Sequence, residues 1–146
     1  MSNKEDSWAL MFWKPAGNAK SPSLKELKKE QQGNSPAKKK FLTLVELVED
    51  LGPELILPYN RRLGPNLYEL RDVGNGKRYY YKETDFLLIE EGSEKRIILL
   101  LLVAGDKGSQ DGDIKLSEER AKQSMEKDNI LNEENLEIVR KNTYES

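Results

Sequence analysis

The sequence of 146 residues contains neither cysteine nor histidine. Without cysteine, the chain can form no disulfide framework, no Cys-ligated zinc site and no thiol nucleophile. Without histidine, it also lacks the usual general base near neutral pH and any His-ligated zinc. Proton transfer in this chain therefore falls to the side chains of Asp, Glu, Lys and Tyr.

Long hydrophobic runs are also missing. The longest, residues 97–104, is far shorter than the roughly 20 residues that a membrane-spanning helix needs. Residues 2–6 are polar or charged, so the start of the sequence does not resemble a signal peptide. We therefore expect a soluble, cytoplasmic protein with no membrane contact, folded around a single core.

Charge is unevenly distributed along the chain, although the formal net charge is only -2. Residues 1–40 carry nine Lys and four acidic residues, whereas residues 41–146 carry 15 basic and 22 acidic residues. Because each contact with a nucleic-acid phosphate needs a nearby cation, any surface that binds nucleic acid must be local. The run 38–40 of three lysines is one candidate, although a solvated helix start explains it more simply.

Three helices are predicted. Ser21-Pro22 and Ser35-Pro36 are typical helix starts, and the first helix is expected to end near Gln32. The second has apolar residues at helical spacing from Phe41 to Leu51 and stops at Gly52-Pro53. The third is expected to start at Ser117 and to end near Lys127.

Strands are predicted before and after the first two helices. Residues 8–13 form an apolar, aromatic run, and residues 67–73 and 77–81 flank Asn75-Gly76, which favours a two-residue hairpin turn. Residues 86–89 and 97–103 are two further candidates, the second typical of a central strand buried on both faces. The loop 105–112 follows.

This order of elements predicts an α+β fold. We expect a mainly antiparallel, twisted sheet of four to five strands, two N-terminal helices and one C-terminal helix. Residues 1–127 would form the domain, and residues 128–146 a polar tail for which a short helix is considered around Leu136 and Val139.

The hairpin has a chemical consequence. Side chains alternate between the two faces of a strand, so one face carries Tyr68, Leu70, Tyr79 and Tyr81, and the other carries Glu69, Arg71, Arg78, Tyr80 and Lys82. Two arginines beside an exposed tyrosine would suit a phosphodiester, because guanidinium groups match phosphate geometry and the ring can stack on a base or transfer a proton. The alternative is a solvated face with ion pairs from Glu69 to Arg71 and Lys82. A shift of one residue in register would reverse the faces.

The loop 105–112 is rich in glycine and aspartate, as some ligand-binding loops are. Counted from Asp106, its third residue is Gly108 and its sixth is Asp111, so the calcium pattern of an EF-hand fails, and no phosphate-binding P-loop is present. Two interpretations stay open. The loop could present Lys107 and Gln110 to a phosphate or ribose at the sheet edge, or it could be a connecting turn.

Three ordered motifs resemble a known family. The first comprises GPEL at 52–55, PYNR at 58–61, LG at 63–64 and LYELR at 67–71; the second is Arg78 with Tyr81; the third comprises GDK at 105–107, SQ at 109–110 and DI at 113–114. Over about residues 8–125 they resemble the RelE/ParE superfamily of toxins from toxin–antitoxin systems. The nearest branch is that of the HigB-like, phage-derived killer proteins.

The resemblance implies a function. Many relatives cut mRNA on the ribosome without a metal or cofactor, by attack of a ribose 2′-OH on its own phosphate. It implies that Arg71, Arg78 and Lys107 stabilise charge, that Gln110 orients the phosphate and that Arg61 makes an outlying phosphate contact. The geometry of the hairpin, and not the resemblance, suggests Tyr80 as a base or as a stacking partner for a nucleobase. We also expect Lys77 and Lys82 to contact RNA.

The implied partners are the ribosome, mRNA and a cognate antitoxin, often of the helix-turn-helix type. The function expected from the resemblance is thus that of a type II toxin acting as a ribosome-dependent mRNA endonuclease. The alternative is a non-catalytic binding protein on the same fold, either a gyrase inhibitor or an inactive toxin that only binds its antitoxin.

Overall fold

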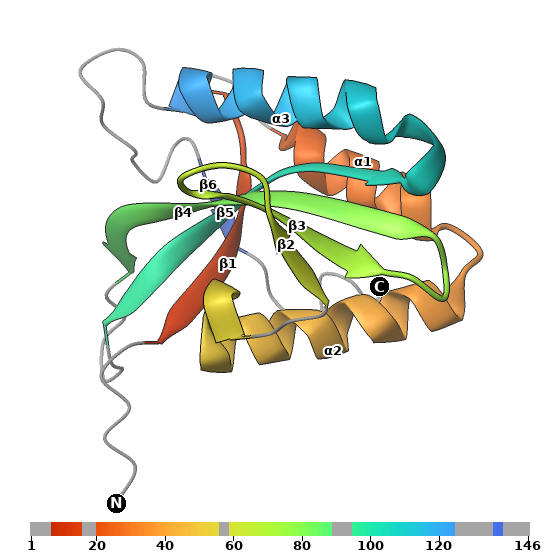
Figure 1. Ribbon diagram of the computed structural model, residues 1–146, viewed down its shortest axis with the longest axis horizontal. Helices are drawn as coiled ribbons and strands as arrows, with labels where there is room; N and C mark the ends of the chain where they lie inside the picture. Colours follow the sequence, from red (N-terminus) through yellow and green to blue (C-terminus); the bar gives the residue numbers. More distant parts are fainter. Residues whose placement is uncertain (1–6, 16–19, 56–58, 89–94, 125–135, 139–146) are drawn as a thin grey trace, which may run out of the picture.

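The computed structural model describes residues 7–15, 20–55, 59–88, 95–124 and 136–138, and these form an α+β fold (Figure 1). The strands are β1 (Trp8–Trp13), β2 (Asn60–Arg62), β3 (Leu67–Asp72), β4 (Lys77–Leu88), β5 (Arg96–Asp106) and β6 (Leu136–Ile138). The α-helices are α1 (Pro22–Gln31), α2 (Ser35–Leu51) and α3 (Gln110–Ser124), and the short 3-10 helices are η1 (Pro53–Leu55) and η2 (Lys107–Ser109).

The strands form one sheet in the order β2-β3-β4-β5-β1-β6. Neighbouring strands are antiparallel except β1 and β5, which run parallel with Trp8 opposite Ile97 and Phe12 opposite Leu101. The α+β class and the placement of two helices before the hairpin and one after β5 are confirmed. The expected antiparallel pairing holds for the other strand pairs, but the β1–β5 pair makes the sheet mixed. A long connection separates β1 from β5, so the chain can return to the starting end as a parallel pair requires.

Each face of the sheet carries its own apolar core. On one face, α1 and α2 pack against the hairpin and β5, and Figure 1 shows α2 and α3 on opposite sides of the sheet. The predicted aromatic face lies in this first core, whose largest members include Phe12, Phe41, Tyr68, Tyr79 and Tyr81. The second core lies under α3 and contains Met11, Trp13, Tyr80, Ile98, Leu100, Leu102 and Val103. As predicted, β5 is a central strand buried on both faces.

Side chains from the helices form hydrogen bonds with backbone groups of the sheet where a strand has no neighbouring strand. Beyond the end of β1, Glu26 of α1 accepts a hydrogen bond from the Ala104 amide, and Arg120 of α3 donates to the Leu102 carbonyl at 2.6 Å. Glu26 and Arg120 also form a two-pronged ion pair with N–O distances of 2.9 and 2.7 Å. In the same way, Glu49 of α2 accepts from the Leu10 amide at 2.8 Å. Backbone groups that β-pairing leaves open are thus satisfied by side chains.

The hairpin between β3 and β4 has a longer turn than predicted. The expected register paired Arg71 with Tyr80, whereas Arg71 lies opposite Arg78 and Asp72 opposite Lys77. Four residues turn the chain instead of two, because the Asp72 carboxylate accepts hydrogen bonds from both the backbone and the side-chain nitrogen of Asn75. The register differs from the predicted one by two residues. Because side chains alternate with a period of two, every side chain stays on its predicted face.

Helix α3 begins earlier than predicted. The helix begins at Gln110 instead of Ser117, and the predicted loop 105–112 is split among β5, η2 and α3. Asp106 explains the early start, since its carboxylate accepts hydrogen bonds from the Gly108 and Ser109 amides. The extra turns place Gln110 and Ile114 over the sheet.

Three further elements differ from expectation. The strand predicted at 86–89 belongs, as far as Leu88, to one continuous β4, whose pairing with β5 is irregular between Glu83 and Leu87. Residues 60–62, for which no element was predicted, form β2 against β3. The short helix considered around Leu136 is instead strand β6 at residues 136–138, paired with β1; the rest of the predicted tail lies outside the described residues.

None of the described helices is both long and apolar enough to cross a membrane.

Gly52 provides a test of how the C-terminal end of α2 packs against β1. It has a φ of +85°, and a Cβ there would lie 2.6 Å from the Trp8 ring, whereas Gly33, with a φ of +69°, has open space. We expect Gly52→Ala to lower the free energy of unfolding by about 2–4 kcal/mol, because strain adds to a clash, and Gly33→Ala to lower it by about 1 kcal/mol from strain alone. Urea unfolding measures both. Equal losses would contradict the packing of Trp8 on Gly52.

Candidate functional site

The predicted polar face of the hairpin lies on the same side of the sheet as α3. Cross-strand pairing places Arg71 opposite Arg78 and Glu69 opposite Tyr80, and β2 adds Arg61 opposite Glu69. We call the surface formed by Arg61, Arg71 and Arg78 around Glu69 the arginine face. Because side chains of paired residues point the same way, the three guanidinium groups share this face.

Glu69 lies at the centre of the arginine face, with none of its side chain exposed. Its Oε2 accepts a hydrogen bond of 2.7 Å from the Gln110 side chain at the start of α3. Its Oε1 lies 3.4 Å from Arg61 Nε and 3.5 Å from Arg71 Nε. A buried carboxylate needs such compensation, so Glu69 fixes both arginines and ties α3 to the hairpin.

Polar atoms without hydrogen bonds gather at this one place. Among the described residues, four buried side-chain atoms lack a hydrogen-bond partner: Glu69 Oε1, Arg71 Nε, Arg78 Nε and Tyr80 OH. Arg71 Nε and Glu69 Oε1 nevertheless face each other as an ion pair at 3.5 Å, and Tyr80 OH lies close to the same carboxylate. Buried polar groups in folded proteins are nearly always paired, so Arg78 Nε, which has no hydrogen bond, indicates a place for a ligand or water that accepts one.

The exposure predicted for Tyr80 is wrong. Its side chain is fully buried in the second core, because α3 begins early enough to cover it, so the ring cannot stack on a base. Burial raises the pKa of Tyr80 above its ordinary value, and the charge of Glu69 adds to this. The phenol is therefore protonated at neutral pH and acts as a donor, not a base. Arg78 is also more buried than expected, with 8% of its surface exposed.

Asp113 is a polar neighbour that sequence reasoning did not select. It accepts a hydrogen bond from Ser109, and a Cβ at Gly105 would overlap its carboxylate. Gly105 lies opposite Arg78 in the sheet, so Asp113 packs over this end of the arginine face. Burial raises the pKa of Asp113, and the hydrogen bond from Ser109 opposes the shift. In the sequence, Asp113 stood out only as part of the DI pair of the third motif.

The remaining predicted residues separate into two groups. Lys107 is exposed at the hairpin end of the sheet, where its amide donates to the Gly76 carbonyl at 2.9 Å. Lys77, in contrast, is not brought to the arginine face. It lies on the opposite side of β4 and forms an ion pair of 3.3 Å with Glu30 of α1.

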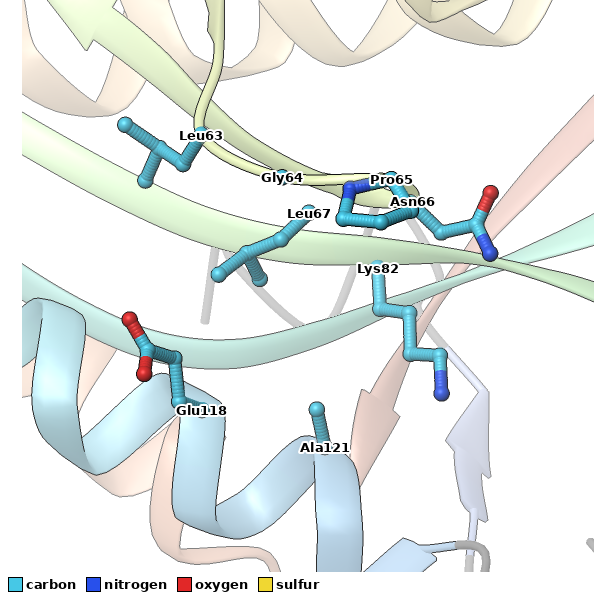
Figure 2. Close-up of a pocket in the computed structure, with 8 residues that line it drawn as sticks. All are labelled: Leu63, Gly64, Pro65, Asn66, Leu67, Lys82, Glu118 and Ala121. Atoms are coloured by element: carbon cyan, nitrogen blue, oxygen red, sulfur yellow. The ribbon is translucent and has the colours of Figure 1, made fainter.

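Lys82 lines a pocket beside the arginine face. The pocket has a volume of about 440 Å³ and is bounded by the β2–β3 connection, the hairpin strands and α3. Figure 2 shows Leu67 and Lys82 pointing from the sheet towards α3, which presents Glu118 and Ala121. Burial lowers the pKa of Lys82, and the charge of Asp85 opposes this effect.

The site contains no recognisable metal centre in the part of the chain that the structure describes, where no three acidic residues gather as ligands. In comparisons with known proteins, no family model and no curated protein matches this chain. The case for function therefore depends on the geometry of the arginine face and its surroundings.

Two adjacent tyrosines provide a test of the unpaired donor. Tyr81 OH donates a hydrogen bond of 2.8 Å to Asn60, whereas Tyr80 OH lies near the Glu69 carboxylate without a well-aligned hydrogen bond to any described residue. We expect Tyr81→Phe to lower the free energy of unfolding by about 1–2 kcal/mol, because it leaves the buried Asn60 oxygen unpaired. Tyr80→Phe should change it by less than about 0.5 kcal/mol in either direction. Thermal unfolding of both variants measures the difference, and a loss at Tyr80 equal to that at Tyr81 would mean that its hydroxyl is already bonded within the fold.

Proposed function

We propose that this protein is a toxin of a type II toxin–antitoxin system, of the RelE/ParE kind and its HigB-like branch, and that it cleaves mRNA on the ribosome. The observation that carries the proposal is that the guanidinium groups of Arg61, Arg71 and Arg78 share one face of the sheet, where Arg78 Nε has no hydrogen bond among the described residues. All three arginines lie in the motifs that resemble the family.

Three guanidinium groups on one face of the sheet favour an anion with several acceptor oxygens. A phosphate group reaching between Arg71 and Arg78 would accept from both guanidinium groups, which suit its geometry. Arg71 keeps 35% of its side chain exposed and Arg61 keeps 48%, so the face is open to a polyanion at these two residues. Lys107 would add charge from the hairpin end.

In the proposed reaction, the ribose 2′-oxygen attacks the adjacent phosphorus and the bond from phosphorus to the 5′-oxygen breaks. The 2′-oxygen loses its proton to a base, the leaving 5′-oxygen takes up a proton from solvent, and the products are a 2′,3′-cyclic phosphate and a 5′-hydroxyl. Negative charge grows on the phosphate oxygens during the attack, and Arg71, Arg78 and Lys107 would stabilise it. No metal or cofactor is needed for this chemistry.

Glu69, Gln110 and Tyr80 are positioning residues in this proposal. Glu69 holds Arg61 and Arg71 by their Nε atoms, which leaves the terminal nitrogens of both free among the described residues. Tyr80 lies beneath the arginines and offers its hydroxyl proton to an oxygen bound between them. Since neither Tyr80 nor Glu69 is exposed, the base that removes the 2′ proton would come from outside this buried group, which favours a reaction that depends on the ribosome.

The proposed partners follow from the charge of the arginine face. Ribosome-bound mRNA would supply the phosphate backbone, and an antitoxin, often of the helix-turn-helix type, would neutralise the toxin by covering this face. The overall charge of -2 does not oppose RNA binding, because the three arginines form a local cationic surface.

A non-catalytic binding protein is the second candidate. The burial of Tyr80 and Glu69 favours it, because a group that exchanges protons with RNA has to reach the substrate. Such a protein would inhibit gyrase or bind an antitoxin, and it would leave transcripts intact.

Expression in cells that lack an antitoxin tests the proposal. We expect the wild type to stop growth and to cut transcripts at positions that primer extension maps. Arg71→Ala/Arg78→Ala should reduce cleavage by at least about 100-fold, since it removes both guanidinium groups from the transition state.

A matched control removes two positive charges elsewhere. Lys25 and Lys28 are exposed on α1, so Lys25→Ala/Lys28→Ala should keep growth arrest and cleavage. Intact transcripts with the wild type would refute the nuclease. Cleavage that the arginine variant retains would refute the assignment of the site.

A further inference from the structure

The pocket beside the arginine face holds two opposite charges that do not meet. Lys82 projects from β4 and Glu118 from α3, and both line the pocket. Among the described residues, neither side chain forms an ion pair or a hydrogen bond; the nearby charge of Asp85 acts on Lys82 only at longer range. An ammonium and a carboxylate that face one cavity separately are suited to a ligand with acceptors on one edge and donors on another.

Apolar groups form the rest of the pocket wall. Leu63, Pro65, Leu67 and Ala121 provide flat or aliphatic surface, and Asn66 adds an amide at the rim. The volume of about 440 Å³ is within the range of pockets for small organic ligands. A planar heterocycle with polar edges fits this combination better than an aliphatic or highly charged ligand.

The sheet connects the pocket to the arginine face. Leu67 and Lys82 are a cross-strand pair, Glu69 and Tyr80 are the next pair on the same side, and Arg71 and Arg78 follow. Successive pairs on one side are separated by about 6.7 Å, so the pocket floor lies about 13 Å from the arginines. A chain whose phosphate lies on the arginine face can therefore place a nearby base in the pocket.

We infer that the pocket bounded by Lys82 and Glu118 binds a guanine base of the RNA. This inference rests on the proposed function, because it assumes that the polyanion on the arginine face is RNA. Guanine presents two adjacent donors, N1–H and the N2 amino group, which together match one carboxylate. Its O6 and N7 acceptors lie on the neighbouring edge, where an ammonium is a common partner.

The other bases match the two charges less well. Adenine places the N1 lone pair beside its amino group, so a carboxylate that accepts from the amino group meets a second acceptor. Uracil has a single ring donor between two carbonyl groups, and cytosine has no ring N–H. Guanine therefore makes the largest number of hydrogen bonds with Glu118 and Lys82 together.

Titration with mononucleotides tests this inference apart from cleavage. The full chain, made by cell-free synthesis and labelled with ¹⁵N, is titrated with GMP, AMP, CMP and UMP while its amide NMR signals are followed. We expect GMP to shift the signals of Leu63, Leu67 and Lys82, and to bind about tenfold more tightly than the other three.

Two variants and a control locate the preference. Glu118→Gln should remove the preference for GMP, and Lys82→Met should weaken GMP binding about fivefold or more. Glu119, the next residue, is also exposed, so Glu119→Gln should bind GMP as the wild type does.

Equal binding of all four nucleotides, no shifts at the pocket, or a guanine preference that survives Glu118→Gln would each overturn the inference. Cleavage of transcripts without a guanine preference would refute the pocket and leave the nuclease standing. A guanine preference without cleavage would refute the nuclease and leave guanine recognition standing.

Discussion

One buried carboxylate organises the α3 side of the sheet. Glu69 has no exposed surface, and its two oxygens face different partners, Gln110 on one side and two arginines on the other. A carboxylate in this position destabilises the fold unless it is compensated, so its partners cannot be replaced independently. The side chain of Gln110 at the start of α3, the guanidinium group of Arg71 and that of Arg61 on β2 are thus all oriented by a single charge.

Much of the fold could be predicted from local patterns. The turn of Asp72 and Asn75 changed the register by two residues, so the division of the hairpin into an aromatic and a polar face was correct although its pairs were not. The parallel pairing of β1 with β5 could not be predicted in this way, because an apolar run such as 8–13 does not specify which strand lies beside it. The merging of residues 86–88 into β4 was hidden by Thr84 and Asp85, which interrupt the apolar pattern.

The candidate site was predictable to a smaller extent. The sequence indicated which residues share a face, and Arg61, Arg71, Arg78 and Gln110 do meet around Glu69. The sequence did not indicate that Glu69 and Tyr80 are buried, because their burial depends on where α3 begins. The cap at Asp106 adds two turns to the helix, and these cover Tyr80 and bring Asp113 over Gly105. Glu69 itself was considered only as part of a solvated strand face, the alternative interpretation, since an acidic residue that alternates with Tyr68 and Leu70 is typical of an exposed strand position.

The bridge between α1 and α3 has a consequence for how other chains can associate with the sheet. Past the end of β1, the edge of β5 would expose backbone groups to any extended peptide, and sheets are readily lengthened at such places. Here Glu26 and Arg120 already occupy the Ala104 amide and the Leu102 carbonyl while they bind each other. A peptide seeking to pair with this half of β5 would have to break a two-pronged ion pair and separate two helices, so strand addition is closed at this stretch of the molecule.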